Sequence, residues 1–251
     1  MNILVIPDLQ VKPGQSLKHL KWLAKYIAAK QPDCIVQLGD LWDIPSLSSY
    51  DIGKKAAENK RLCLDVDAGM KAVNMLEEAI KGVRGYKPKK IFVEGNHEFR
   101  IKRYENDFPA LAGSLFSPVD YMRDLGWDAH PFLAVVKYAG ISFSHFFPRT
   151  IKGTTSAASQ RNGPASASAM VRANMTSCIG GHKQGLDIYI HNLDSHRVRG
   201  IIAGSFYTHN EDYHSPQGNS YWRGVLMLNN VKNGDYDLTE VSIDYLRKKY
   251  R

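Results

Sequence analysis

Residues 91–98, with the sequence Ile-Phe-Val-Glu-Gly-Asn-His-Glu, constrain the fold of this chain more than any other stretch. The run begins with apolar residues between basic ones, which is typical of a short buried strand. Gly95 then permits a sharp turn, and Asn96, His97 and Glu98 follow at the strand's carboxyl end. Ligands bind at that end of open α/β sheets, so we expect a functional site here. The alternative is a polar loop whose histidine only caps a turn.

Four other apolar runs are followed by polar side chains in the same way. The runs are residues 3–6, 34–38, 141–144 and 177–179, and the polar residues after them are Asp8 and Gln10, Asp40 and Asp43, His145, and His182 and Gln184. Between the first two runs, residues 16–30 carry an apolar stripe at helical spacing, with Ser16 as the expected N-cap. This order of strand, helix and strand predicts a right-handed βαβ unit.

The rest of the chain predicts further helices and strands. Residues 53–81 are expected to be helical, with Gly69 dividing them into two helices, and a short helix is expected to end at Gly126. Beyond these, the sequence predicts a hairpin with its turn at residues 139–140, weak helix over 165–175, and strands over 187–190, 198–203, 224–228 and 236–243. No long linker interrupts the pattern, so residues 1–251 are expected to form a single domain.

Composition narrows the class of protein. The 251 residues are 43% hydrophobic and 23% charged, as in ordinary globular proteins. No apolar run approaches the roughly 20 residues that span a bilayer, and the first residues lack the features of a secretory signal. The three cysteines, Cys34, Cys63 and Cys178, are too few and too widely spaced for a disulfide framework, so we expect reduced core residues. A cytoplasmic location is the resulting expectation.

The net charge of +8 favours polyanionic partners, with phosphate-containing ligands first among them. Part of the excess lies in residues 247–251, which we interpret as a solubilising tail. Many proteins without such partners are equally basic, so charge alone leaves nucleic acid binding open.

The side chains after the five runs have the chemistry of a metal centre. Carboxylate and amide oxygens mixed with imidazoles suit Mn²⁺, Fe, Zn²⁺ or Mg²⁺ better than metals that prefer thiolates. Two such ions about 3.5–4 Å apart can clamp a phosphate and generate a hydroxide. One carboxylate has to bridge the ions, and Asp40, directly after Gly39, is the best candidate.

In their order along the chain, these blocks resemble the motifs of the calcineurin-like metallophosphoesterase superfamily. The matching blocks are Asp8-x-Gln10, Gly39-Asp40-x-x-Asp43, Gly95-Asn96-His97-Glu98, His145 and Gly181-His182-x-Gln184. The resemblance implies an α/β fold, namely a four-layered α/β/β/α sandwich of two mixed sheets, with the site at the edge that the sheets share. It also implies a metal-dependent hydrolase that acts on phosphate ester bonds.

The resemblance also assigns roles to individual residues. Asp8 would bind the first ion, and Asp40 would bridge both ions. The second ion would be completed by Asn96, His145 and His182. His97 would act as the general acid toward the leaving oxygen or stabilise charge on the phosphoryl group. Arg100 falls where it can contact the phosphate, while Asp43 and Glu98 would support the loop or orient a histidine.

The chain departs from the family pattern at two positions, Gln10 and Gln184, where the family has histidines. Both changes fall on the first ion and leave the ligands of the second intact. A glutamine oxygen is neutral and suits zinc less well than imidazole does. We therefore expect two divalent ions, with Mn²⁺ favoured over Mg²⁺, Fe or Zn²⁺ and the first site weaker. The alternative is an inactive first site in a protein that serves as a binding module.

The substrate class follows from charge and aromatic residues. We expect a phosphodiesterase that acts on nucleic acid or a nucleotide by attack of a metal-activated hydroxide. The alternatives are a phosphomonoesterase resembling protein phosphatases and a catalytically weak, metal-stabilised binding domain. Aromatic and cationic residues also alternate over 207–223, in keeping with nucleotide contact. The oligomeric state is left open.

Two further features are candidates for substrate binding. Trp42 lies beside Asp43 and could stack a base, although it could equally be a packed loop anchor. Residues 146–168 are expected to form a mobile cationic loop beside the site, in which Arg149, Lys152 and Arg161 grip a polyanion. The alternative for that segment is an ordinary surface loop.

Overall fold

The computed structural model describes residues 1–147, 166–211 and 218–251, which form two mixed β-sheets and six α-helices. The six-stranded sheet has the order β11 (Asp235–Ser242), β10 (Gly224–Lys232), β1 (Ile3–Ile6), β2 (Cys34–Gln37), β3 (Lys89–Val93), β4 (Asp128–His130). The five-stranded sheet has the order β5 (Val136–Tyr138), β6 (Ile141–Ser144), β7 (Cys178–Gly180), β9 (Arg197–Ala203), β8 (Leu186–Asn192). Strands β1 to β4 are parallel, as are β6, β7 and β9, and the remaining strands pair antiparallel at the edges.

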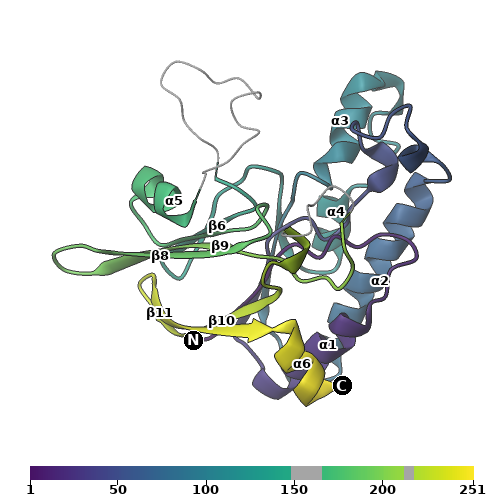
Figure 1. Cartoon of the computed structure of the whole chain (residues 1–251). Helices are drawn as coiled ribbons and strands as arrows, with labels where there is room; N and C mark the ends of the chain where they lie inside the picture. The colour runs from purple at the N-terminus through teal and green to yellow at the C-terminus, as the bar shows by residue number, and fades with distance from the viewer. Residues whose placement is uncertain (148–165, 212–217) are drawn as a thin grey trace.

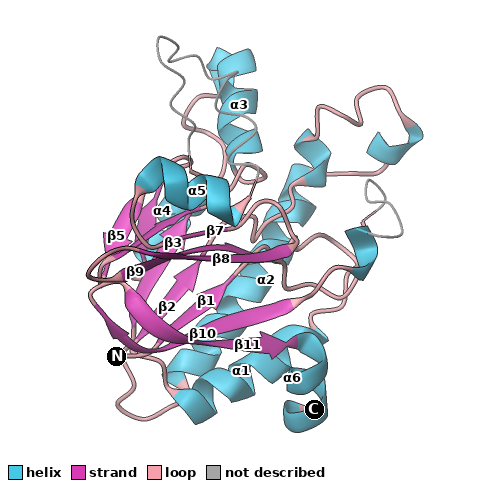
Figure 2. Ribbon diagram, turned by 60° about the vertical axis from the view of Figure 1, so that its left-hand side comes forward, coloured by secondary structure: helices cyan, strands magenta, loops and turns pink. Residues whose placement is uncertain are grey.

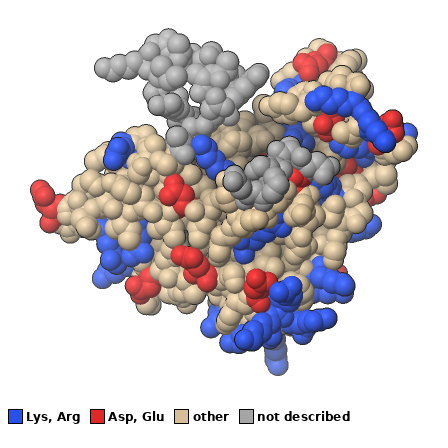
Figure 3. Space-filling model, viewed as in Figure 1, with Lys and Arg blue, Asp and Glu red and all other residues tan. Residues whose placement is uncertain are grey.

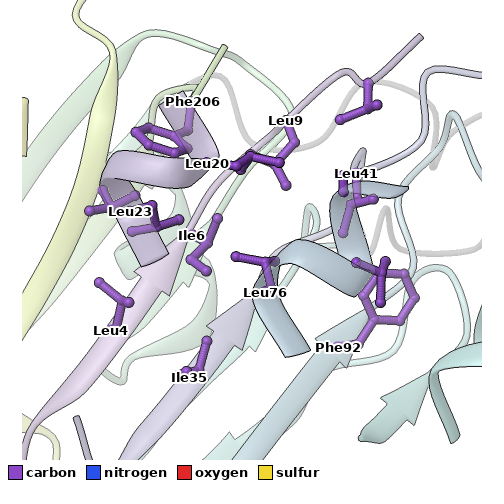
Figure 4. Packing of buried hydrophobic residues seen from close by; sticks show 14 of the residues in the cluster. Leu4, Ile6, Leu9, Leu20, Leu23, Ile35, Leu41, Leu76, Phe92 and Phe206 are labelled. Atoms are coloured by element: carbon purple, nitrogen blue, oxygen red, sulfur yellow. The ribbon is translucent and has the colours of Figure 1, made fainter. Parts of the chain in front are cut away.

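The alternation of side chains along β1 explains why the molecule has layers. Leu4 and Ile6 point to one face of the first sheet and join the largest apolar cluster, together with residues of α1 (Lys18–Lys30) and α2 (Leu62–Lys81) (Figure 4). Ile3 and Val5 point to the opposite face and pack against the second sheet. A side chain of this size contributes roughly 1.5–3 kcal/mol when fully buried, so both faces of β1 stabilise the fold.

The second sheet is covered on its outer face by α5 (Ala167–Asn174), whose Met170 and Val171 pack against Cys178 and Val198. On the other side of the molecule, α4 (Pro118–Asp124) and α6 (Ile243–Tyr250) join α1 and α2 on the first sheet. The order is helices, sheet, sheet, helix, as Figures 1 and 2 show. This arrangement confirms the predicted four-layered α/β/β/α sandwich.

Several local predictions need correction. Gly69 does not divide a helix, because α2 runs unbroken from Leu62 to Lys81. A Cβ at this position would overlap the ring of Trp42, so the glycine admits a close side-chain contact. Residues 247–251 are not only a tail, since most belong to α6, which caps its first turn with Ser242 and buries Leu246. Cys63 is exposed, unlike the other two cysteines.

Strand β4 and helix α3 (Phe99–Asp107) were absent from the sequence-based assignment. Short 3-10 turns occur at Pro45–Leu47, Lys55–Ala57, Pro109–Leu111 and Gly218–Ser220. Helix α1 begins at Lys18, and Ser16 accepts a weak 3.4 Å hydrogen bond from its first amide. Within the described residues, no helix combines the length and apolar character required to cross a bilayer.

Candidate metal centre

The candidate centre lies beyond the carboxyl ends of β1, β2 and β3 of the first sheet and β6 and β7 of the second. The loops that leave these strands hold several non-glycine residues in the left-handed region of φ, which L-residues rarely adopt. These are Gln10 (φ 47°), Asp40 (49°), Ile44 (48°), His182 (70°) and Gln184 (51°). Such strain persists only where the surrounding structure enforces it and tends to gather at functional sites.

Four side chains converge at what would be the second ion position. Asn96 Oδ1 lies 2.9 Å from His145 Nε2 and 2.7 Å from His182 Nδ1. Asp40 Oδ2 lies 3.4 Å from His145 Nε2. Asp40, His145 and His182 each offer a ligand atom within 4.8 Å of the other two. One carboxylate, one amide oxygen and two imidazoles therefore face a common point.

The orientation and charge of His145 fit a cation at that point. Its Nδ1 donates to the Leu38 carbonyl at 2.7 Å, which leaves Nε2 to bind an ion. Burial alone would lower the pKa of His145, but the carboxylates of Asp40 and Asp8 raise it to about 10. Burial and the neighbouring His145 lower the pKa of His182 to about 4. The carboxylates thus stabilise positive charge at His145, and its Nε2 has to lose a proton before it can bind an ion.

The first ion position is less complete. Asp8 Oδ2 and Gln10 Oε1 are buried, and neither accepts a hydrogen bond from any residue that the structure describes. A buried oxygen without a donor typically costs about 1–3 kcal/mol, and a cation would satisfy both oxygens. Burial raises the pKa of Asp8 to about 7, and a nearby cation would favour its ionised form. The residues at this position therefore also fit an ion.

The two glutamines differ in how they are held. The Gln10 amide nitrogen donates to Asp40 Oδ2 at 3.1 Å, which places Gln10 directly beside the expected bridging carboxylate. Gln184 instead accepts a 2.6 Å hydrogen bond from the Tyr207 hydroxyl at its side-chain oxygen. That hydroxyl occupies one of the two lone pairs of the Gln184 oxygen, the atom that would bind an ion. Sequence reasoning did not foresee Tyr207, because its position near Gln184 arises only from the tertiary fold.

Glu98 fixes the loop that carries Asp40. One of its carboxylate oxygens accepts from the amides of Asp40 at 2.9 Å and Gly95 at 3.0 Å, and the other accepts from the amide of Trp42 at 2.9 Å. The backbones of Asp40 and Gly95 approach so closely that a Cβ at Gly95 would overlap the Asp40 amide nitrogen. The Gly-Asn-His-Glu block therefore positions Asp40 as well as supplying its own polar side chains.

His97 lies beside the cluster, and both nitrogens of its ring have polar neighbours. Its Nδ1 lies 2.6 Å from Asp43 Oδ1, and its Nε2 lies 3.7 Å from Asp40 Oδ2. Arg100 donates from Nη1 to the carbonyl of Asp43 at 2.7 Å, and its Nη2 lies 3.3 Å from His97 Nε2. Although burial and the charge of Arg100 oppose it, the carboxylates of Asp40 and Asp43 raise the pKa of His97 above its ordinary value. The protonated form is therefore favoured, as a proton donor requires.

A second polar network supports Asp43, and it was not foreseen from the sequence. Lys12 Nζ lies 3.5 Å from Asp43 Oδ2 and 2.7 Å from Glu211 Oε2, and both acids are buried. His209 pairs with the other oxygen of Glu211 at 2.6 Å. Lys12 and Glu211 are 199 positions apart, and no local motif signals their contact.

Trp42 does not line the candidate centre. Its side chain is 0% exposed, its ring packs against Phe92, Phe116 and Tyr121, and its indole nitrogen donates to the Val66 carbonyl at 3.2 Å. The expectation that it stacks a base is wrong, and the packed-anchor alternative describes it. Arg149, Lys152 and Arg161 lie outside the described residues, so the expected cationic grip is untested.

Two phage proteins are similar to this chain in sequence. One is the Gene 54 protein of Mycobacterium phage L5, 27% identical over 187 residues, which are 74% of this chain and 70% of that protein. The other is the Gene 54 protein of Mycobacterium phage D29, 34% identical over 112 residues, which are 44% of this chain and 41% of that protein.

Among solved structures, similarity extends over nearly the whole chain at low scores. Yfce, a phosphoesterase from E. coli, aligns with a TM-score of 0.43 and 16% identity, covering 97% of this chain and 100% of that one. Vps29 from Chaetomium thermophilum aligns with a TM-score of 0.42 and 14% identity, covering 95% and 93%.

A family model gives the decisive comparison. The model of the calcineurin-like phosphoesterases matches residues 1–167, a range that contains Asp8, Asp40, Asn96, His97 and His145. The match spans more than half of the chain, and it ends before β7 and the loop that carries His182. The chain belongs to the calcineurin-like phosphoesterase family.

Proposed function

We propose that this protein hydrolyses phosphodiesters of nucleic acids or nucleotides at a centre that holds two divalent ions. Family membership supports a metal-dependent phosphoesterase. The observation that carries the proposal is the convergence of Asp40, Asn96, His145 and His182, beside two buried oxygens that lack donors among the described residues. Mn²⁺ is the ion we propose, because amide and carboxylate oxygens contribute as much to the centre as imidazoles do.

The proposal divides the ligands between two positions. Asp8 and Gln10 would hold the first ion, Asn96, His145 and His182 would hold the second, and Asp40 would serve both. When bound, the ions would neutralise charge on the phosphate and lower the pKa of a water molecule. Gln184 would join the first position through the side-chain oxygen that also accepts from the Tyr207 hydroxyl.

The residues beside the two ion positions act on the oxygen that leaves the phosphorus atom. His97 presents its Nε2 on the side of Asp40 and donates a proton to the leaving group, while Asp43 holds Nδ1 and so fixes the direction of the ring. Arg100 is anchored on the carbonyls of Asp43 and Ile44 and keeps positive charge next to His97. Lys12 pairs with Asp43 and is itself paired with Glu211, so this network stabilises the position of Asp43.

The preference for a diester rests on charge. Lys and Arg exceed Asp and Glu by eight over the whole chain. In Figure 3 basic side chains gather around α6 at the lower right, and others lie at the upper right, where α3 is found. A positive surface raises the local concentration of polyanions. We therefore favour nucleic acids or nucleotides over phosphomonoesters.

A second candidate is a binding domain that uses its metal for structure. The hydrogen bond between Tyr207 and Gln184 favours it, since a weak first ion position would leave the protein with little hydrolytic activity. The two candidates differ in whether any divalent ion confers turnover.

The test is hydrolysis of bis(p-nitrophenyl) phosphate and p-nitrophenyl phosphate with Mn²⁺, Mg²⁺, Zn²⁺ or Ni²⁺. We expect turnover of the diester, greatest with Mn²⁺, and a lower kcat/KM for the monoester. A higher kcat/KM for the monoester would replace the diesterase with a phosphomonoesterase. Metal binding without turnover of either compound would favour the binding domain.

A further inference from the structure

A groove with a volume of about 120 Å³ adjoins the candidate centre and has no role in the function proposed so far. One wall is a face of α3 that presents Arg100, Arg103 and Tyr104, and the other is the segment from Ser46 to Ile52. This volume is smaller than that of pockets that enclose a whole small-molecule ligand, so the groove suits one part of a larger substrate. The groove therefore has the position of a subsite next to the candidate centre.

Arg100 belongs to both the groove and the centre. Arg100 lines the groove, and its Nη2 lies 3.3 Å from His97 Nε2. The groove thus begins next to the residue that we propose as proton donor. A substrate whose scissile phosphate occupies the metal centre would extend its next chemical group into this space.

The lining has two kinds of chemistry. Arg103 is exposed and, within the described part of the chain, forms no ion pair. The ring of Tyr104 lines the groove and packs against Phe108, with ring centroids 4.6 Å apart. Leu47 and Ile52 add apolar surface on the opposite wall. An unpaired cation beside an aromatic and aliphatic surface suits a ligand that combines a planar ring with an anionic group.

The distribution of residues on α3 argues against an incidental polar surface. Arg100, Arg103, Tyr104 and Asp107 follow the helical spacing of one face, and all four line the groove. The interior face of the same helix buries Ile101 and Glu105. Asp107 is the single acid that lines the groove, at the end of α3, so the two arginines leave the lining net positive.

We propose that this groove binds the nucleotide unit next to the scissile phosphate, with its base against Tyr104 and Ile52 and its second phosphate on Arg103. This inference rests on the proposed function and adds the substrate's recognition element to it. The shared chemistry is a nucleoside that carries phosphate on both sides, as in an internal nucleotide of a nucleic acid strand or in a free nucleoside bisphosphate.

The test is calorimetric titration, with Mn²⁺ present, of thymidine 3′,5′-bisphosphate and thymidine 5′-monophosphate. A charge-assisted contact to the extra phosphate predicts that the wild type binds the bisphosphate roughly tenfold more tightly. Arg103→Ala should reduce this ratio of Kd values to about one. Tyr104→Leu should weaken both ligands and keep the ratio.

Lys102→Ala is the matched control, because it removes one positive charge from the same helix but outside the groove, where Lys102 pairs with Glu105. This variant should keep the wild-type ratio. Equal affinity of the wild type for both ligands, failure to bind either, or an unchanged ratio in Arg103→Ala would overturn the inference.

Binding does not require turnover, so the two proposals can fail separately. If the predicted Kd ratio is found but no diester is hydrolysed, the proposed enzymatic function is wrong and the nucleotide-binding groove stands. If a diester is hydrolysed but the ratio is not found, the groove is wrong and the enzymatic function stands. Tighter binding of an oligothymidylate than of the bisphosphate would identify a nucleic acid strand as the ligand, and weaker binding would identify a free nucleotide.

Discussion

His97 is the residue whose surroundings most directly indicate a chemical role. Asp43 and Arg100 fix its ring at the edge of the cluster, and it is not one of the proposed ion ligands. We expect His97→Ala to lower kcat for a diester by about 10²–10⁴-fold, since a positioned general acid contributes this much. The metal content of the variant, measured by elemental analysis, should equal that of the wild type.

The control for this prediction is His130→Ala, because His130 pairs with Asp128 away from the cluster. Its kcat should match the wild-type value. Loss of metal from His97→Ala would contradict the assigned role and make His97 a ligand.

The glutamine pair sets the expected properties of the first ion. Replacing Gln10 and Gln184 together by histidine should tighten binding at that position by roughly tenfold or more and shift the preference from Mn²⁺ toward Zn²⁺, since imidazole is the better zinc ligand. Titration of both proteins with each ion measures the change. Unchanged affinities would show that neither side chain faces the ion. Tyr207→Phe in the wild-type background should also tighten the binding of Mn²⁺, because it removes the hydroxyl that shares the Gln184 oxygen with the ion.

The residues that the structure brings together were largely accessible from sequence, and the reason is physical. Asp40, Asn96, His145 and His182 each follow a short apolar run closely, and parallel strands deliver their carboxyl ends to one edge. What the sequence hides are contacts between distant segments. The Lys12–Glu211 pair and the Tyr207–Gln184 hydrogen bond have no local pattern.

For Trp42, the sequence suggested two roles and could not decide between them. An aromatic residue beside a site motif is compatible with stacking a base or with packing, and only the burial of its ring distinguishes the two.

At the scale of elements, the loop after β2 is shaped by its contact with helix α2. Gly69 lies against the ring of Trp42, and a Cβ there would overlap it. Gly69→Ala should lower the free energy of unfolding by about 1–3 kcal/mol through overpacking, although alanine is the better helix former by about 1 kcal/mol. Urea denaturation measures the change.

The partner variant is Trp42→Phe, whose smaller ring should make room for the added methyl group. In that background Gly69→Ala should cost less or become stabilising. A stability gain from Gly69→Ala in the wild-type background would contradict the close packing.

The elements that sequence reasoning identified are those with strong apolar patterns, such as β1, β2, β3 and α1. Helices α3 and α6 were missed because each is mostly charged and fully buries little apolar surface of its own, Ile101 in one and Leu246 in the other. Their helical state depends on packing against neighbours and on capping, as by Ser242, which a periodicity argument does not capture.

Over the whole molecule, stability should depend on pH through His19 of α1. This side chain is 2% exposed and lies edge-on to Phe206, and burial, with the nearby His209, lowers its pKa from 6.5 to about 4. A lowered pKa means that the unfolded chain takes up the proton first, so stability is full above about pH 6.5 and falls toward pH 4.

The loss over this range should reach roughly 3 kcal/mol, and His19→Leu should remove it. Urea denaturation of both proteins between pH 7 and pH 4.5 tests this expectation. Parallel pH profiles for the two proteins would contradict it. Sequence periodicity placed residue 19 in a helix but gave no sign that its imidazole is buried against Phe206.

The central claim is that one carboxylate, Asp40, joins two ion positions at the edge shared by the two sheets. Calorimetric titration of the metal-free protein with Mn²⁺ tests it most directly, with Asp128→Asn as the control because that carboxylate lies on the surface. The wild type and the control should each bind two ions per chain, one more tightly than the other, and Asp40→Asn should lose both. A wild type that binds one ion or none, or an Asp40→Asn variant that still binds two, would contradict the claim.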